Sequence, residues 1–552
     1  MLRSVKKQEK LNYMAIHNKN RFRKKLQFVA LLLFFQIPIF AQVEYKNPVL
    51  PGFFPDPSIC KAGDDFYMVN SSFGYFPGVP IFQSKNLVNW KQIGYVLDRE
   101  EQLPLANAQT TLGIFAPTIR FHEGVFYMTT TNISDKGNFY VTAKNPAGPW
   151  SNPVWIKTPG IDPSLFFDDN GKVYITSAQN WGPVQNGIVM SEINIKTGEL
   201  LSEPITIWRG TGNKNPEGPH IYKKDGFYYL LIAEGGTEYG HGVTIGRSPN
   251  IWGPFESNLA NPILSHANAK GAENPIQGVG HGDLVQANDG SWFMMALGFR
   301  PLNNHQVLGR ETFLAPVVWE KDKWPVVNGN GTISVDMKVA QLPGKVTAVN
   351  YNQNEDFSAD KLGLDWNYLN NPVKENYSLL ERKGYLRLYG SVKSLSQNNG
   401  VTFVGRRQNL FDFTATTTLD FNPKTANEEA GITLFKEALY HYQLSIRKKG
   451  KQRELVLSYN IGQINAVAKQ IVLKDGAVNL IIKGTQEFYE FGFSQGKDAV
   501  TILGKVDSRF LSTETAGGFT GLYIGLFASG NGVKSKTAAD FDWFVYTNNN
   551  LK

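Results

Sequence analysis

Short hydrophobic runs, cut by Gly, Pro and Asn at close intervals, make up most of the chain after residue 43. Within a run, hydrophobic and polar residues tend to alternate, which is the period of a β-strand. Five aromatic runs of this kind are spaced along the first part of the chain, at 65–69, 125–129, 172–176, 226–230 and 291–295. Between residues 43 and 340 we find no long stretch with the 3.6-residue period of an amphipathic helix. The pattern therefore predicts an all-β fold of short strands.

A related motif precedes each aromatic run. The first copy is Asp56-Pro57-Ser58-Ile59, and the others lie at 116–119, 162–165, 217–221 and 281–285. Each copy begins 11 or 12 positions before an aromatic residue of its strand, and successive copies begin 46 to 64 residues apart. A repeat of this length suits a four-stranded sheet, which cannot bury both of its faces alone. We therefore predict a five-bladed β-propeller over residues 43–340, in which equivalent positions face one another around the axis.

The pattern changes after the fifth repeat. The motif stops, and residues 341–355 form a polar connection that we interpret as a linker. From 356 to 547 the chain contains further alternating strands, such as 414–421 and 454–459, without the repeat. This predicts a second domain made of two packed antiparallel sheets, a β-sandwich. We expect the sandwich to cover the propeller and shape its pocket rather than to bind glycan, because no stripe of exposed aromatic residues is recognisable in it.

The positive charge of the chain is concentrated at its start. The net charge is +8 with a pI near 9.1, and residues 1–25 hold nine Lys or Arg against one acid, Glu9, so the rest of the chain is formally neutral. No basic surface for nucleic acid is predicted. An apolar run follows at 26–40 and ends at Ala41. We interpret 1–41 as a secretory signal peptide, starting at Met1 or Met14, and expect an exported (periplasmic or secreted) protein with no membrane attachment after cleavage.

The chain has a single cysteine, Cys60, so no disulfide can form within it. Cys60 lies between Ile59 and Lys61 in the first repeat, and we expect it to be a small buried hydrophobic residue.

Three of the five motifs carry a carboxylate, at Asp56, Asp162 and Glu217. Each acid taken alone is explained by turn chemistry, because Asp before Pro and Ser commonly binds the backbone ahead of it. Together, on the inner strands of a propeller, they would lie close to one another, and at least one should have a raised pKa. A protonated acid and an ionised base beside a cleft is the arrangement used in glycoside hydrolysis. The sequence contains no Gly-x-Ser-x-Gly elbow, His-Glu-x-x-His motif or phosphate-binding Gly loop.

These motifs, taken in order, resemble those of glycoside hydrolase family 43, which includes β-xylosidases and α-L-arabinofuranosidases. The matching segments span the whole predicted propeller: 47–52, 54–58, 76–79, 84–90, 115–118, 161–164, 217–220, 280–283 and 309–312. The C-terminal region is similar to the concanavalin-like β-sandwich that accompanies many members of this family.

The resemblance implies roles for the three acids. Asp56 matches the general base that activates water, Glu217 the general acid, and Asp162 a third acid that tunes the pKa of Glu217 and orients it. The family inverts configuration, so the resemblance implies that the Asp56 and Glu217 carboxyl groups lie roughly 6.5–9.5 Å apart. It implies a secreted exo-acting enzyme that removes terminal α-L-arabinofuranose or β-D-xylose from plant cell-wall polysaccharides or oligosaccharides. The choice between the two sugars stays open.

The resemblance also suggests substrate-binding residues. His281 and Arg310 match positions that line the family's pocket, with structural pairing beneath the site as the alternative. Phe115 stands where many relatives have Trp and is expected to stack on the terminal sugar. Phe73 is a candidate for the pocket mouth, together with Tyr75 and Phe76. No cofactor is expected to be required, although a structural cation such as calcium in the propeller channel near His281 is a further expectation.

Two other functions fit the predicted architecture less well. A retaining fructan hydrolase would carry an Asn-Asp-Pro-Asn type motif in the first blade and a Glu-Cys pair at the acid, whereas this chain has Pro55-Asp56-Pro57-Ser58 and Glu217-Gly218. A non-catalytic carbohydrate-binding propeller would have lost at least one of the acids, and all three are present.

Overall fold

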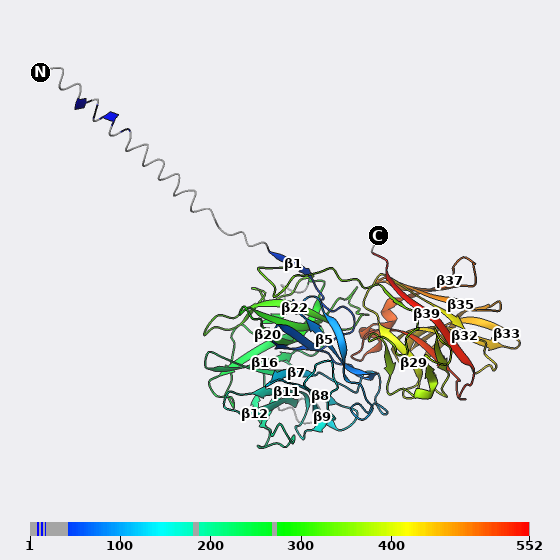
Figure 1. Ribbon diagram of the computed structural model, residues 1–552, viewed down its shortest axis with the longest axis horizontal. Helices are drawn as coiled ribbons and strands as arrows, with labels where there is room; N and C mark the ends of the chain where they lie inside the picture. Colours follow the sequence, from blue (N-terminus) through cyan, green and yellow to red (C-terminus); the bar gives the residue numbers. More distant parts are fainter. Residues whose placement is uncertain are drawn as a thin grey trace. The chain divides into compact units, whose positions relative to one another are not determined.

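The computed structural model describes residues 42–179, 187–267 and 273–550, together with Gln8, Glu9, Leu11, Tyr13, Met14 and His17 (Figure 1). The chain divides into two compact units, one of residues 1–44 with 338–341 and the other of residues 45–337 with 342–552. Almost all of the predicted signal peptide lies outside the described residues, so export stays a prediction. In the part of the chain that the structure describes, no helix has both the length and the hydrophobicity to cross a membrane.

The larger unit begins with five antiparallel sheets, which are the blades of a propeller. Blade 1 contains β2 (Ser58–Ala62), β3 (Asp65–Val69), β5 (Gly78–Ser84) and β6 (Lys91–Leu97). Blade 2 contains β7 (Thr118–His122), β8 (Val125–Asn132), β9 (Gly137–Ala143) and β10 (Val154–Trp155). Blade 3 contains β11 (Ile161–Phe167), β12 (Val173–Gln179), β13 (Gly187–Glu192) and β14 (Ile205–Trp208). Blade 4 contains β15 (Glu217–Lys224), β16 (Phe227–Glu234), β17 (Gly242–Ser248), β18 (Glu256–Ser257) and β19 (Leu264–Ser265). Blade 5 contains β20 (Gln277–Gln286), β21 (Trp292–Phe299), β22 (Glu311–Val318) and β23 (Val326–Val327).

The repeated motif forms or leads into the first strand of each blade, and the aromatic run forms the second. The two strands make a hairpin, as in blade 1, where Cys60 pairs with Tyr67. The first strands contact one another in a closed ring, in the order β2, β7, β11, β15, β20 and back to β2. The predicted five-bladed propeller is therefore confirmed. Cys60 is buried, as expected.

The segment before β2 closes the ring against blade 5. Leu50 forms a β-bridge with Thr312 of β22, and the backbone N–H of Leu314 donates to Asn47 Oδ1 over 2.9 Å. Further along, the N–H of Phe54 donates to the carbonyl of Arg310 over 3.0 Å. The chain therefore runs along blade 5 before it reaches Asp56. The first motif thus lies where blade 5 meets blade 1.

A buried ion pair lies at the axis of the propeller. Asp283 of β20 is fully buried and accepts hydrogen bonds from Arg120 Nη1 of β7 (2.8 Å) and Ser58 Oγ of β2 (2.6 Å). The hydroxyl of Tyr222 in β15 also donates to Asp283. Burial opposes the charged carboxylate, but the Arg120 cation, together with the hydrogen bonds from Arg120 and Ser58, holds the pKa of Asp283 well below its usual range. Four of the five blades thus meet at one carboxylate.

His220 connects the third blade to this network. Its Nδ1 atom lies 2.9 Å from Arg120 Nη2 and 3.1 Å from Ser164 Oγ of β11. Because a guanidinium can only donate, His220 Nδ1 accepts and the ring is neutral. Burial lowers the pKa of His220 to about 3, which agrees with a neutral ring.

The C-terminal domain is a sandwich of two antiparallel eight-stranded sheets, as predicted. The first sheet contains β25 (Gln353–Glu355), β27 (Tyr377–Ser378), β28 (Leu386–Tyr389), β30 (Phe413–Asp420), β35 (Val478–Gly484), β36 (Phe488–Ser494), β37 (Thr501–Asp507) and β39 (Ala538–Asn548). The second contains β4 (Tyr75–Phe76), β26 (Asn367–Leu369), β29 (Thr402–Arg407), β31 (Glu429–Glu437), β32 (Tyr440–Lys449), β33 (Gln452–Ile461), β34 (Ile464–Val472) and β38 (Tyr523–Ser529). Outside these sheets, the described residues from 42 to 550 also form η1 (Lys374–Asn376), η2 (Ser508–Leu511), α2 (Thr513–Ala516) and a strand pair of β1 (Val43–Lys46) and β24 (Asp336–Val339).

The two domains share a sheet, because β4 of the propeller sequence pairs with β26 of the sandwich. The Tyr75 ring stacks on Tyr523 of β38, with their centroids 3.9 Å apart. Arg407 of β29 donates from Nε to the carbonyl of Phe53 over 2.8 Å. Tyr75 is fully buried, and neither Tyr75 nor Phe76 lines the cavity at the propeller axis, so the prediction that they form the pocket mouth is wrong.

We predict that Arg120→Met lowers the free energy of unfolding by about 3–5 kcal/mol, because it leaves the buried carboxylate of Asp283 without its cation. The measurement is urea unfolding followed by tryptophan fluorescence. The matched control is Asp336→Asn, which removes the ion pair between Lys46 and Asp336, whose side chains are 78% and 74% exposed. An exposed pair contributes little, so this variant should keep the wild-type midpoint; equal loss in both variants would contradict a special role of the axis.

Candidate active site

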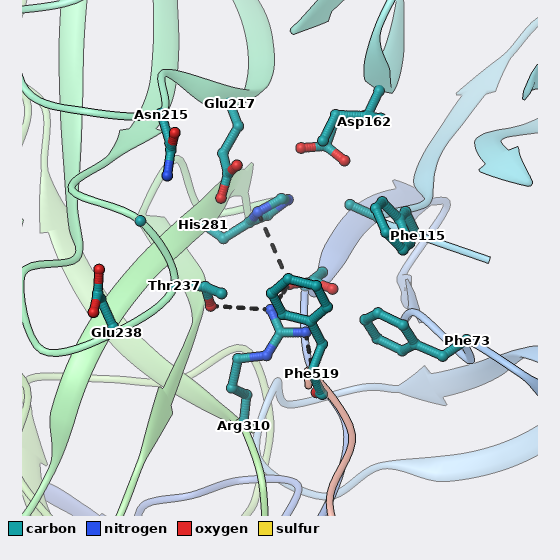
Figure 2. Close-up of a pocket in the computed structure, with 14 residues that line it drawn as sticks. Phe73, Phe115, Asp162, Asn215, Glu217, Thr237, Glu238, His281, Arg310 and Phe519 are labelled. Atoms are coloured by element: carbon teal, nitrogen blue, oxygen red, sulfur yellow. Dashed lines mark hydrogen bonds and ion pairs between the residues drawn. The ribbon is translucent and has the colours of Figure 1, made fainter. Parts of the chain in front are cut away.

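One cavity of about 320 Å³ is lined by seven of the nine residues that the sequence suggested for the site, all except Tyr75 and Phe76 (Figure 2). Its lining consists of Asp56, Phe73, Phe115, Ala116, Ile161, Asp162, Asn215, Glu217, Gly236, Thr237, Glu238, His281, Arg310 and Phe519. The carboxyl groups of Asp162 and Glu217 both face this cavity, and Phe73 and Phe115 lie across from Asn215 and Glu238. Side chains from all five blades and from the sandwich therefore meet in one place.

The backbone in or just before the inner strands departs from regular strand geometry at the site residues. Asp56, Asp162 and His281 have positive φ angles of 53°, 55° and 46°, and Gly218, directly after Glu217, has 57°. The pairing of β11 with β12 shifts register between Ile161 and Ser164, and that of β15 with β16 between Glu217 and His220. Such bulges redirect a side chain out of the sheet, at a cost in backbone strain that the surrounding sheet must offset. This is how strand residues come to face the axis.

Asp56 is held on both carboxylate oxygens. Arg310 Nη1 donates to Oδ1 over 2.7 Å, and Ser71 Oγ donates to Oδ2 over 2.5 Å. Arg310 also donates from Nη1 to Thr237 Oγ1 (3.1 Å) and from Nη2 to the carbonyl of Phe519 (3.4 Å). The carboxylate is therefore fixed in orientation by a buried cation that is itself anchored on two other segments.

The other two acids have raised pKa values. Burial, and then the negative charge of Asp56, raises the pKa of Glu217 to about 7, with Arg310 opposing the shift. Burial, and then the charges of Glu217 and Asp56, raises the pKa of Asp162 well above its usual range, against the N–H of Gly218, which donates to Asp162 Oδ2 over 3.1 Å. Near neutral pH the cavity can thus hold a protonated acid beside an ionised carboxylate.

His281 packs beneath the acids. Its Nδ1 atom lies 3.9 Å from Asp56 Oδ1, and burial lowers its pKa, with the Asp56 charge opposing. A Cβ atom built on Gly218 would lie 2.9 Å from the His281 ring, closer than real Cβ contacts allow. Glycine is therefore required at position 218 for two reasons. Its φ angle is positive, and the His281 ring leaves no room for a Cβ atom.

An aromatic wall closes one side of the cavity. The ring centroid of Phe73 lies 5.6 Å from that of Phe115 and 6.2 Å from that of Phe519. The Arg310 guanidinium lies over Phe73 and Phe519, 5.6 and 5.8 Å from the ring centroids. Apolar faces beside charged groups suit a sugar ring, which has apolar C–H faces and polar edges.

Sequence reasoning missed Asn215, Thr237, Glu238 and Phe519. Asn215 lies in the connection from blade 3 to blade 4, and Thr237 and Glu238 lie in the loop between β16 and β17; neither loop carries the repeat motif. Phe519 follows Gly517 and Gly518, whose pair of glycines indicates a sharp turn. Nothing local indicates that this turn, about 200 residues after the propeller ends, reaches the propeller axis.

The expected cation near His281 stays a prediction. Within residues 42–179, 187–267 and 273–550, no group of three or more His, Cys, Asp or Glu side chains is placed to hold a metal ion. Both oxygens of the nearby Asp56 carboxylate already accept a hydrogen bond, one from Arg310 and one from Ser71.

The model of glycosyl hydrolases family 43 matches residues 45–325, which contain every propeller residue of this site. The chain belongs to glycoside hydrolase family 43. A second model, the beta xylosidase C-terminal concanavalin A-like domain, matches residues 354–547. The family 43 enzyme is therefore a glycosidase with a concanavalin-like sandwich, as the sequence predicted.

Relatives of the family 43 enzyme align over nearly their whole length. The non-reducing end α-L-arabinofuranosidase BoGH43B of Bacteroides ovatus is 43% identical over 92% of this chain and 95% of its own. A xylosidase/arabinosidase of Butyrivibrio fibrisolvens is 40% identical over 91% and 98%. The solved structure named xylan beta-1,4-xylosidase, from Bacillus halodurans, is 32% identical and superposes with a TM-score of 0.86 over 91% of this chain and 99% of its own.

We predict that Gly218→Ala lowers kcat/KM on nitrophenyl glycosides by at least about tenfold, because a misplaced His281 disturbs the acids above it. The control is Gly226→Ala in the same blade: Gly226 also has a positive φ, of 82°, but a Cβ there meets nothing within 4 Å. Both variants share the backbone strain of about 1–2 kcal/mol. Equal activity of the two variants would show that the contact with His281 does not matter for catalysis.

Proposed function

We propose that this enzyme is an exo-acting, inverting glycosidase that removes a terminal pentose from plant cell-wall polysaccharides or oligosaccharides. One observation carries the proposal: Asp56, Asp162 and Glu217 come from three different blades and line the same cavity. An inverting glycosidase uses one carboxylic acid to protonate the leaving oxygen and a second carboxylate to activate water on the opposite face of the sugar. This cavity offers both groups and a third acid that can tune them.

Asp56 is the general base in this proposal. A base must be ionised and aimed at the water, and the Arg310 cation and the Ser71 hydroxyl bind its two oxygens. Water attacks the anomeric carbon as Asp56 takes its proton, and the bond from that carbon to the leaving oxygen breaks. The released pentose then has the opposite anomeric configuration.

Glu217 is the general acid, because it must hold a proton near neutral pH and give it to the leaving oxygen. Its raised pKa, about 7, supports this role. Asp162 is the modulator: its coupling to Glu217 disfavours charge on both groups, and it accepts a hydrogen bond from the N–H of Gly218, the residue that follows Glu217. Asp162 thus acts on the proton affinity and the orientation of the acid.

The substrate is a terminal pentose. L-Arabinofuranose is the first candidate, since BoGH43B, 43% identical to this chain, is named a non-reducing end α-L-arabinofuranosidase. D-Xylose is the second, since the Butyrivibrio relative is named a xylosidase/arabinosidase. A cavity of about 320 Å³ walled by Phe73, Phe115 and Phe519 is at the small end of the range for ligand sites and suits a chain end rather than the middle of a chain.

We predict that the purified enzyme releases nitrophenol from the α-L-arabinofuranoside, the β-D-xyloside or both, and that proton NMR shows the inverted anomer first. Glu217→Gln and Asp56→Asn should each lower kcat by about 10²–10⁴-fold, because each removes a proton transfer. The control is Asp168→Asn, since Asp168 is a buried carboxylate bound by Lys223 and Tyr228 outside the cavity. Full activity of either acid variant, or a retained anomer, would contradict the mechanism.

We predict that kcat/KM falls as the pH rises through about 7, because Glu217 must be protonated to act and its pKa is raised to about 7. Asp162→Asn should move this alkaline limb to lower pH, because a charge on either of these two carboxyl groups opposes ionisation of the other, and the variant loses this repulsion. The measurement is the pH profile of kcat/KM for both proteins. An alkaline limb at the same pH in the variant would show that Asp162 does not tune the acid.

A further inference from the structure

Phe519 belongs to the sandwich but lies in the cavity at the propeller axis. It is part of a short segment, residues 513–520, that consists of α2, two glycines with positive φ, Phe519 and Thr520. The segment has no strand pairing of its own, so its position depends on the side-chain and backbone contacts at its two ends.

The propeller holds one side of this segment. The N–H of Thr513 donates to the carbonyl of Gln306 over 3.1 Å, and the N–H of Gln306 donates to Glu514 Oε2 over 2.8 Å. The N–H of Phe519 donates to Thr111 Oγ1 over 2.6 Å, and Arg310 reaches the carbonyl of Phe519. The Phe519 backbone is thus bound by the same arginine that holds the catalytic carboxylate Asp56.

On the other side, the sandwich binds both ends of the segment with one buried cation. Lys436 of β31 is 1% exposed, and its ammonium donates to Thr513 Oγ1 over 2.9 Å and to the carbonyl of Thr520. The Thr520 hydroxyl in turn donates to the carbonyl of Lys436 over 3.3 Å. Lys436 therefore ties together the first and the last residue of the segment.

A buried ammonium is a costly way to fill this space. Its two acceptors are a hydroxyl and a carbonyl rather than a carboxylate, and burial lowers the pKa of Lys436 to about 7, against the charges of Glu437 and Glu514. For packing alone, an apolar residue of the same length would serve the core better. We therefore attribute the burial of this ammonium to its contacts with Thr513 and Thr520.

We infer that Lys436 is a positioning residue for hydrolysis: it fixes the 513–520 segment so that Phe519 forms one wall of the sugar cavity, and it thereby sets the affinity for the terminal sugar. The inference rests on the proposed sugar-hydrolysing role of the cavity. It assigns the sandwich a part in substrate binding through a residue that does not itself line the cavity.

The test is a double-mutant cycle of Lys436→Met and Phe519→Ala, measured on whichever nitrophenyl pentoside the wild type hydrolyses. Lys436→Met should raise KM by about tenfold and change kcat by less than about threefold, because an interaction made equally in the ground and transition states is lost. In the Phe519→Ala background the same change should alter KM by less than about twofold, since the side chain that Lys436 positions is gone. An unchanged KM, or the full effect without Phe519, overturns the inference.

The matched control is Arg453→Met. Arg453 is also a buried cation of the sandwich that donates to backbone carbonyls, those of Phe421, Lys474 and Gly476, none of them near the segment. It should lose stability in thermal unfolding while keeping the wild-type KM. An equal rise in KM would show that Lys436 acts only through general stability and would overturn the inference.

Hydrogen exchange of the 513–520 amides, read by mass spectrometry, tests the clamp without any assay of activity. Exchange there should be faster in Lys436→Met and intermediate in Lys436→Gln, which can still donate, while the strands of the sandwich keep their protection. Unchanged exchange overturns the inference. If the wild type hydrolysed neither pentoside, the proposed function would fail while this measurement still decided whether Lys436 holds the segment.

Discussion

The buried contact between Arg120 and Asp283 at the propeller axis is the constraint on which the site depends. Blades 1, 2, 4 and 5 contribute partners to it, and His220 links it to blade 3. A propeller blade is a separate sheet with no hydrogen-bonded strand shared with its neighbour, so the relative position of two blades depends on contacts such as these. Asp283 lies two residues after His281, whose ring packs beside Asp56. The axis network therefore determines where the acids of different blades meet.

Two effects act on the acids of the cavity: burial away from water and the Arg310 cation. Burial favours the neutral forms of Asp162 and Glu217, whereas Arg310 binds Asp56 directly and only opposes the shift at Glu217. The same environment thus separates the three acids, one hydrogen-bonded to a cation and two with raised pKa values. Left-handed backbone at Asp56, Asp162 and Gly218 is what allows strand residues to reach this arrangement.

The sandwich is part of the site rather than an appendage. It takes β4 from the propeller sequence into one of its sheets, stacks Tyr523 on Tyr75 and places Phe519 in the cavity. Because Arg310 binds both Asp56 and the Phe519 carbonyl, the wall and the base share one support. A propeller without the sandwich would lack Phe519 and with it one side of its cavity.

The sequence alone determined the all-β class, the five blades and the meeting of the three acids at one cavity. A repeat places equivalent residues on the propeller axis whatever the details of packing. It also predicted Phe73, Phe115, His281 and Arg310, through motifs that resemble a known family. It could not place Tyr75 and Phe76, whose short strand is used by the other domain, or find Phe519 and Lys436. Those positions depend on contacts between residues more than 400 and more than 70 positions apart, such as Thr111 with Phe519 and Lys436 with Thr513. Only tertiary packing brings such groups together, since no local pattern of the chain records which surface a loop will meet.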